Sequence, residues 1–145
     1  MSGNIISYKS ILPRIADGVF VADTARVIGD VEIGAGCGIW FGAVIRGDVN
    51  AIRIGAMTNI QDNAVIHVAS EAVMVDGRQK HGYPAIIGNG VTVGHMALIH
   101  ACQIGDDCLI GMNSCVMDAA VVEAGSIVAA GALVTPGKRV PTGQL

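Results

Sequence analysis

The sequence has few aromatic residues and few charged ones, and these shortages exclude several classes of protein. Aromatic side chains make up only 3% of the 145 residues, so a buried core must be built from aliphatic side chains. Charged residues make up 14% and the net charge is −3, which provides no basic surface for nucleic acid or for an anionic membrane. The four cysteines lack C-x-x-C spacing, which favours buried thiols in a reducing cytoplasm over disulfides or a cysteine metal site.

Long apolar runs are missing as well. The opening segment MSGNIISYKS has no charged stretch followed by an apolar stretch, as a secretory signal would. The most apolar region, Ala119 to Val134, is interrupted by Glu123 and Ser126 and is shorter than the ~20 residues of a membrane span. We therefore expect one cytoplasmic domain over residues 1–145, with no membrane or nucleic-acid partner.

Glycine is abundant, and aliphatic residues recur with a period of six. Twenty glycines are too many for a helical protein, because glycine is costly inside helices. A period of six fits neither an α-helix nor a simple alternating strand. It fits a triangular coil in which three hexads complete a turn, and successive turns pair ~4.8 Å apart as parallel sheets. The aliphatic positions in phase are Val21, Val27, Ile33, Ile39, Ile45, Ile54, Ile60, Ile66, Ile87, Val93, Ile99, Ile104, Ile110, Val116, Val122, Val128, Val134 and Val140.

Two insertions interrupt this register. The step from Ile45 to Ile54 is nine residues, three more than one period. The step from Ile66 to Ile87 is 21 residues, fifteen more than one period, and it includes a polar, loop-like segment at about 69–85. An insertion in a solenoid bulges out at a corner and leaves the shaft intact. Such bulges are where solenoids place their binding surfaces.

The register also predicts where the histidines lie. His67 and His100 are 33 residues apart, and without the fifteen-residue insertion the separation is 18, one full coil. The two histidines should therefore stack with their backbones ~5 Å apart, close enough for both to bind one ion. The same arithmetic places Arg46 in this column, one coil earlier. His81 lies in the insertion and is expected to be solvated.

His95 belongs to the preceding hexad, where it should stack over Asp62. Five residues and a corner separate His95 from His100, so the two side chains should leave different sides of the prism. One subunit would not bring all three histidines to one ion. In a three-fold trimer, His67 and His100 of one subunit would meet His95 of the partner subunit. Three histidines with an open fourth position are the arrangement of a catalytic zinc site.

The repeat, [aliphatic]-Gly-x-x-[small]-x, resembles that of the hexapeptide-repeat superfamily, and the histidines resemble those of its γ-class carbonic anhydrases. The matching segments are Val44-Ile45-Arg46-Gly47-Asp48, Asn59-Ile60-Gln61-Asp62-Asn63 before His67, and Val93-Gly94-His95 before His100. The resemblance implies an all-β, left-handed parallel β-helix and a homotrimer. It also implies reversible hydration of CO2 to bicarbonate. Zinc, or alternatively iron or cobalt, would be bound by His67, His95 and His100 across the subunit interface.

The resemblance also implies roles for the neighbouring polar residues. Gln61 would hydrogen-bond the metal-bound water, and Asn59 and Asp62 would support the site from behind the ligands. Arg46 and Asp48 would serve the subunit interface, with Arg46 near bicarbonate. Taken from the residues alone, Arg46 and Asp48 could also be a surface ion pair. Gln61, Asn59 and Asp62 could simply hydrogen-bond at corners.

The sequence departs from the family in two places. The archetypal enzyme has glutamates for proton transfer around the site, whereas here Val49 follows Asp48 and Ser70 stands third after His67. Relatives continue into a C-terminal α-helix, whereas this sequence stops at Leu145, so we expect either that the sequence is truncated or that the helix is absent. The residues of the insertion that could carry the proton instead are Glu71, Asp76 and His81.

Two other functions stay open at this point. The first is an acyltransferase or CoA-thioester hydrolase, in which a single histidine acts as general base without a metal. That function leaves the stacked His67 and His100 unexplained. The second is a non-catalytic trimeric assembly subunit that retains a metal for stability.

Overall fold

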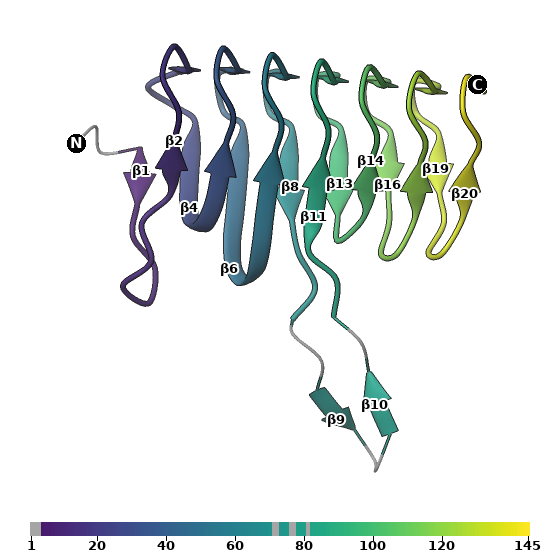
Figure 1. Cartoon of the computed structure of the whole chain (residues 1–145), viewed down its shortest axis with the longest axis horizontal. Helices are drawn as coiled ribbons and strands as arrows, with labels where there is room; N and C mark the ends of the chain where they lie inside the picture. The colour runs from purple at the N-terminus through teal and green to yellow at the C-terminus, as the bar shows by residue number, and fades with distance from the viewer. Residues whose placement is uncertain (1–3, 71–72, 76–77, 81) are drawn as a thin grey trace.

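The computed structural model describes residues 4–70, 73–75, 78–80 and 82–145, and this part of the chain forms strands and no helix. Its coils follow one another along a single axis, with the N-terminus at one end and the C-terminus at the other (Figure 1). Each strand of the shaft pairs in parallel with the strand of the next coil. Within the described ranges, no helix has the length and apolarity that a membrane crossing requires.

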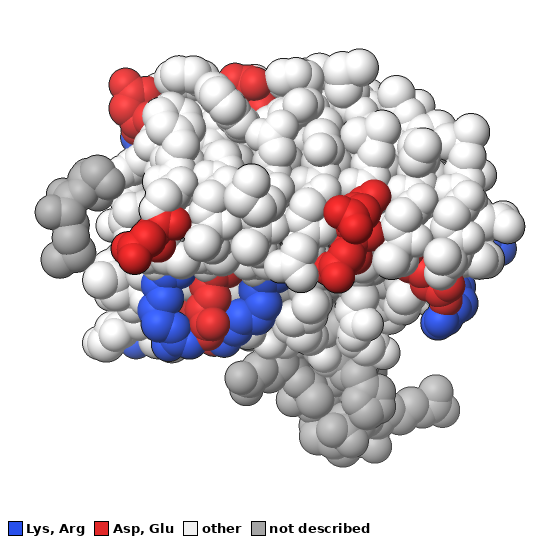
Figure 2. All heavy atoms as spheres, turned by 45° about the horizontal axis from the view of Figure 1, so that its top comes forward, with Lys and Arg blue, Asp and Glu red and all other residues white. Residues whose placement is uncertain are grey.

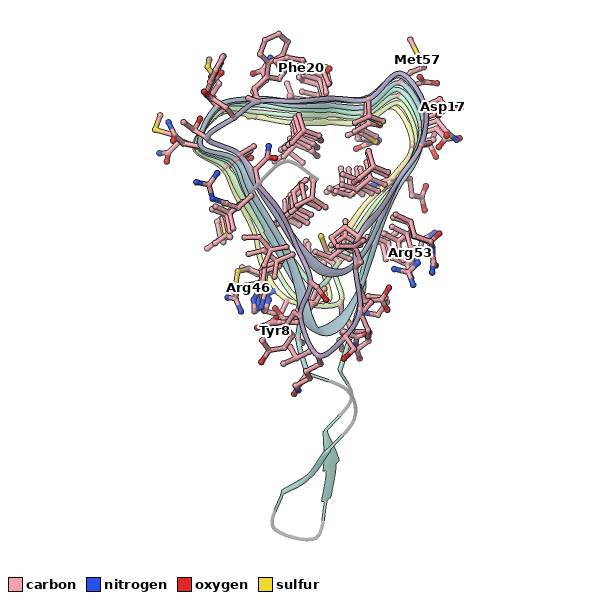
Figure 3. The ribbon with its side chains drawn as sticks, turned by 90° about the vertical axis from the view of Figure 1, so that its left-hand side faces the viewer. Tyr8, Asp17, Phe20, Arg46, Arg53 and Met57 are labelled. Carbon is pink, nitrogen blue, oxygen red and sulfur yellow. The ribbon has the colours of Figure 1, made fainter. Side chains whose placement is uncertain are left out.

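Seen along the axis, the coils superpose as a triangle with three faces (Figure 3). The first face contains β1 (Ile5–Ile6), β8 (Val65–His67), β13 (Leu98–His100), β16 (Cys115–Val116), β19 (Leu133–Val134) and the first parts of β4 (Arg26–Ile33) and β6 (Val44–Ile54). The second face contains the later parts of β4 and β6 with β2 (Arg14–Ile15), β11 (Ala85–Ile87), β14 (Gln103–Ile104), β17 (Val121–Val122) and β20 (Arg139–Val140). The third face contains β3 (Phe20–Val21), β5 (Gly38–Ile39), β7 (Asn59–Ile60), β12 (Thr92–Val93), β15 (Leu109–Ile110) and β18 (Ile127–Val128).

The aliphatic positions of the repeat fill the shaft, as the period of six predicts. On the first face Ile45 pairs with Ile66, and Ile66 pairs with Ile99, and all three side chains are 0% exposed. Val21 and Val140, near the two ends of the shaft, are only half-buried. Because side chains alternate along a strand, the residues on either side of each buried position point outward.

Close contact between coils explains the small residue that often follows the aliphatic one. A Cβ atom added to Gly111 would lie 2.5 Å from the backbone nitrogen of Ala130, and one added to Gly94 would lie 2.7 Å from that of Met112. The neighbouring coil therefore leaves no room for a side chain. The glycine maintains the spacing on which the stacking of every column depends.

Both insertions leave the shaft at the corner between the first and second faces. Gly29 pairs with Gly47 but Val31 pairs with Ile52, so three extra residues bulge out between the paired positions. The second insertion follows β8, and the shaft resumes at β11. Between them β9 (Val73–Val75) and β10 (Arg78–Lys80) form an antiparallel hairpin that projects away from the shaft (Figures 1 and 3). The proton-transfer candidates Glu71, Asp76 and His81 lie outside the described residues.

The cysteines are free thiols, and most are inside the shaft. Cys37, Cys102 and Cys108 are buried, whereas Cys115 is half-buried. Burial raises the pKa of the Cys102 thiol to about 12 and also raises the pKa of the Cys37 thiol. These groups therefore remain protonated at neutral pH and act as small apolar core residues.

Candidate metal centre

His67 and His100 lie side by side on neighbouring coils, as the register predicts. They are paired residues at the ends of β8 and β13, and both rings point outward because Ile66 and Ile99 point into the shaft. The ring centroids are 5.2 Å apart. The closest approach is between His67 Nδ1 and His100 Nε2, at 3.3 Å.

A carboxylate holds the other nitrogen of each ring. His67 Nε2–H donates to Asp48 Oδ1 at 2.9 Å, and His100 Nδ1–H donates to Asp118 Oδ1 at 2.5 Å. An ionised carboxylate can only accept, so the hydrogen-bond network places the ring protons on these two nitrogens. In the neutral rings, the lone pairs of His67 Nδ1 and His100 Nε2 then face one another.

Two facing lone pairs at this distance call for a cation between them, either a proton or a metal ion. Two nitrogens bound at ~2.05 Å to a tetrahedral Zn²⁺ are ~3.3 Å apart. The observed separation of 3.3 Å therefore fits two ligands of such an ion. The two side chains keep 19% and 27% of their surface exposed, which leaves a side open to further ligands.

Arg46 completes this part of the site. It precedes His67 by one coil in the same column, and its guanidinium forms an ion pair with Asp48. Burial alone would raise the pKa of Asp48. The hydrogen bonds from His67, Arg46 and its own backbone amide outweigh burial and lower that pKa below its usual value. Asp48 is therefore charged at neutral pH and serves His67 and Arg46 together.

The other candidate residues lie on β7 and at the corner between the third and first faces, where His95 is found. His95 Nδ1 lies 3.0 Å from Asp62 Oδ2, which confirms the expected stacking of these two positions. Gln61 and His95 both line an apolar hollow of about 440 Å³. Asn59 Oδ1 accepts a hydrogen bond of 2.5 Å from the indole of Trp40.

The predicted site residues thus fall into two groups at opposite ends of the first face. Strand β13 leads from one group to the other, so the Cα atoms of His95 and His100 are on the order of 10–15 Å apart. Within the described ranges, no three His, Cys, Asp or Glu side chains come together to hold a metal ion. The two groups are Arg46, Asp48, His67 and His100 at one end, and Asn59, Gln61, Asp62 and His95 at the other.

Two contacts of the candidate site residues were not predicted from the sequence. Asp118 was not a candidate because Met117 occupies the column position opposite His100, and Asp118 stands one place beyond it. The sequence signal that could have indicated this contact is an acidic residue next to the column that contains His67 and His100. Trp40 is the chain's only tryptophan, and nothing in the spacing indicates that it holds Asn59.

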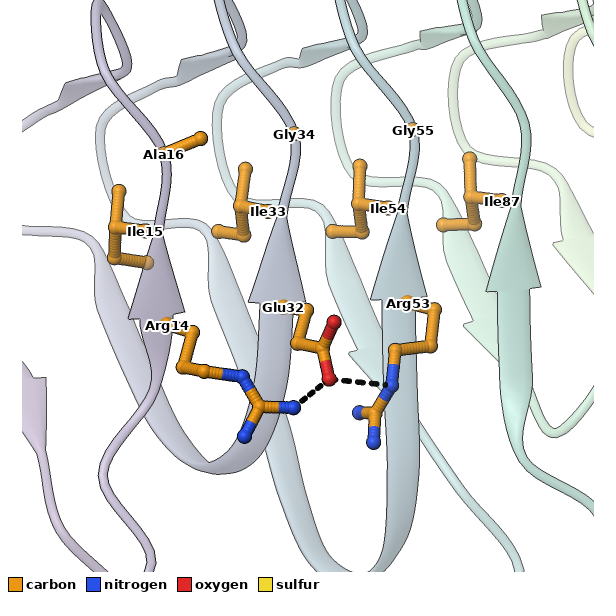
Figure 4. Close-up of a pocket in the computed structure, with 10 residues that line it drawn as sticks. All are labelled: Arg14, Ile15, Ala16, Glu32, Ile33, Gly34, Arg53, Ile54, Gly55 and Ile87. Carbon is orange, nitrogen blue, oxygen red and sulfur yellow. Dashed lines mark hydrogen bonds and ion pairs between the residues drawn. The ribbon is translucent and has the colours of Figure 1, made fainter.

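Another hollow lies elsewhere on the surface. It has a volume of about 600 Å³ and covers part of the second face (Figure 4). Arg14 and Arg53 both form ion pairs with Glu32 at its edge, and Arg53 also pairs with Asp30, so two carboxylates balance the two positive charges. On the side of the molecule drawn in Figure 2, positive groups flank a negative one at the lower left, and the other charged side chains stand apart on a mostly uncharged surface. The histidine groups are therefore the stronger candidates for a functional site.

Comparison with known proteins agrees with this architecture. A family model described as bacterial transferase hexapeptide (six repeats) matches residues 101–136. The structure of a hexapeptide transferase family protein from Anaplasma phagocytophilum superposes with a TM-score of 0.87 and 42% identity, covering 99% of this chain and 78% of that chain. This likeness confirms the predicted left-handed parallel β-helix.

Sequence relatives specify the branch of the superfamily. The mitochondrial gamma carbonic anhydrase 2 of Arabidopsis thaliana is 48% identical over 133 residues, which are 92% of this chain and 46% of that protein. The present chain thus spans about half the length of that relative. Protein YrdA of Escherichia coli strain K12 is 41% identical over 145 residues, 100% of this chain and 77% of that protein. The chain therefore belongs to the γ-class carbonic anhydrase-like proteins of the hexapeptide-repeat superfamily.

Proposed function

We propose that this chain is a metal-dependent carbonic anhydrase, which hydrates CO2 reversibly to bicarbonate at sites shared between the subunits of a homotrimer. The observation that carries the proposal is the pair of ring nitrogens 3.3 Å apart, each backed by a carboxylate on its opposite nitrogen. His67 and His100 would bind the metal with His95 of the partner subunit. Zinc is our first candidate, and iron or cobalt the alternatives. The free, buried thiols agree with a cytoplasmic location.

The division of the site residues into two groups supports the trimer. Each group lies at one end of the first face, so a three-fold rotation can set the His95 end of one subunit against the His67 end of the next. His95 is 45% exposed at its side chain, which leaves it accessible to a second chain. The partner then supplies Gln61 together with His95, because both line the same hollow.

Residues of the chain would bind the metal, orient its ligands and position the substrate. A bound Zn²⁺ would lower the pKa of water to ~7 and so supply a nucleophile for CO2 at neutral pH. Asp48 keeps His67 turned toward the metal and holds the Arg46 guanidinium beside it. The Arg46 side chain is 43% exposed despite this ion pair, so its N–H groups would be able to hydrogen-bond the bicarbonate anion. The Gln61 amide, brought by the partner subunit, would orient the attacking water.

Proton release has no assigned carrier among the described residues. Val49 and Ser70 stand where the family's glutamates would be, and both line a hollow of about 510 Å³ that also includes Asp48 and Lys9. This hollow borders the site at Asp48, on the side of the insertions. We infer that the proton leaves by this route to solvent or buffer.

A second function has one observation in its favour. The contact of 3.0 Å between His95 Nδ1 and Asp62 Oδ2 is the arrangement of a general base held by a carboxylate, and it lies beside an apolar hollow. An acyltransferase or CoA-thioester hydrolase could use it without a metal. That function requires His95 and Asp62 but makes His67 and His100 dispensable.

The experiment combines metal analysis with stopped-flow CO2 hydration on protein purified without oxygen or chelator. We expect about one metal per chain and hydration that is lost, with the metal, in His67→Ala. His81→Ala is the control for metal content and should retain the metal. Metal without hydration would favour a non-catalytic assembly subunit. Absence of metal, with thioester turnover that depends on His95 alone, would favour the second function.

A further inference from the structure

A carboxylate from the coil after His100 is in contact with that histidine's ring. The Asp118 Oδ1 atom lies 2.5 Å from His100 Nδ1. His67 has its own carboxylate, Asp48, supplied by the coil before it. The two stacked rings are thus held between two carboxylates along the column, and the two remaining nitrogens are directed at each other.

The position of Asp118 follows from a local shortening of the repeat. The step from Ile99 to Ile104 is five residues, one fewer than the period, and Ile99 pairs with Val116 at a separation of 17. Met117 therefore lies opposite His100, and Asp118 occupies the start of the corner. The backbone fixes it there, since the amide of Gly137 donates to the Asp118 carbonyl at 2.9 Å and that of Ala119 donates to Ala101 at 2.8 Å.

The charge of Asp118 is directed at His100. Among the ion pairs of the described residues, Asp118 takes part in the one with His100. Asp48, by contrast, is shared between His67 and Arg46. Both partners of the Asp118 contact are half-buried, with 35% and 27% of their side chains exposed, so water screens this contact less than it would on an open surface.

We propose that Asp118 is a positioning residue that keeps the proton of His100 on Nδ1 and thereby presents Nε2 to the metal. This inference rests on the proposed metal site, although the tautomer it predicts does not require a bound ion. An imidazole in water favours the opposite tautomer, with the proton on Nε2. Without Asp118, the proton would occupy the nitrogen that must bind the metal. The carboxylate also makes the ring a stronger ligand, and loss of such partners typically costs 10–100-fold in metal affinity.

Two variants and a matched control test this role. Asp118→Asn retains an oxygen that accepts from Nδ1–H but loses the charge, whereas Asp118→Ala loses both. Asp106→Asn is the control, because Asp106 is likewise a corner carboxylate that accepts hydrogen bonds from the preceding coil, here the Asn89 amides at 2.7 and 3.2 Å. Circular dichroism and sedimentation would establish that all three variants fold and assemble as the wild type does.

The first readout is Zn²⁺ affinity, measured by competition with a chelator. We expect a loss of about 10-fold in Asp118→Asn, about 100-fold in Asp118→Ala, and no loss in Asp106→Asn. Unchanged affinity in both Asp118 variants, in protein whose wild type binds Zn²⁺, would overturn this inference and leave the proposed function standing. Absence of Zn²⁺ binding in the wild type would instead count against the proposed function.

The second readout is the tautomer of His100 in metal-free protein, from ¹⁵N NMR of labelled imidazoles at the same pH for every variant. The wild type and Asp118→Asn should carry the proton on Nδ1, and Asp118→Ala should carry it mainly on Nε2. A purely structural role would not move this proton. A wild-type proton on Nε2, or the same tautomer in Asp118→Ala and wild type, would overturn the inference whatever the affinity.

Discussion

The spacing of the two stacked histidines depends on the column beneath them, and Ile66 is the centre of that column. Ile66 is 0% exposed and packs between Ile45 and Ile99 of the adjacent coils. Ile66→Ala removes three carbon atoms, each worth ~0.8 kcal/mol of transfer free energy. The cavity they leave adds on the order of 1–2 kcal/mol. We therefore expect the free energy of unfolding to fall by about 4 kcal/mol.

The assay is urea unfolding followed by circular dichroism, at one protein concentration for all variants. Val65→Ala is the matched control, since Val65 is the preceding residue of the same strand but is 36% exposed. Its loss should stay below about 1 kcal/mol. Equal losses in the two variants, or a loss near 1 kcal/mol in Ile66→Ala, would refute the assignment of the column to the core.

Three further predictions concern the coil contacts and the thiols. Gly111→Ala should lower the free energy of unfolding in urea by about 3 kcal/mol, because its Cβ would meet backbone atoms of the next coil. Gly131 has a φ of +69° and open space around it, so Gly131→Ala should lower it by about 1 kcal/mol. Similar losses in the two variants would contradict the contact argument. Burial raises the pKa of the Cys37 thiol above 9.0, so the unfolded chain releases this proton first and stability should fall as the pH rises above about 9. Cys37→Ala should flatten that slope, and an unchanged slope would contradict it. In the native protein a thiol reagent should modify the half-buried Cys115 before Cys37.

Much of the fold could be predicted from the sequence, because a hexad repeat constrains the whole chain at once. Each in-phase aliphatic residue must enter the shaft, so the register of one coil determines the next. This is why subtraction of the insertions placed His67 opposite His100 and His95 over Asp62. Handedness is different, since either hand buries the same positions, and it came from the likeness to relatives.

The contacts within the site were less predictable. The period of six predicts the coil and the face on which a residue lies, but it does not predict the rotamer of its side chain. Asp118 reaches His100 through a corner rather than through the column, and Trp40 reaches Asn59 across a face. Both contacts depend on side-chain directions that the backbone register leaves free. The insertion could be located from the register, but the chemistry of its side chains could not.

The most direct test of the central claim, that each metal site is shared between subunits, is metal content in mixed trimers. A trimer built only from His67→Ala subunits, or only from His95→Ala subunits, should bind no metal. When the two variants are co-refolded in equal amounts, about three quarters of the trimers are mixed and each regains one site of three, so we expect about 0.25 metal per chain. A mixture of His67→Ala with His100→Ala should regain none, because both changes affect the same group. The predicted result is that metal binding recovers in the mixture of His67→Ala with His95→Ala and in that mixture alone. No recovery in that mixture, or equal recovery in both mixtures, would contradict the shared site.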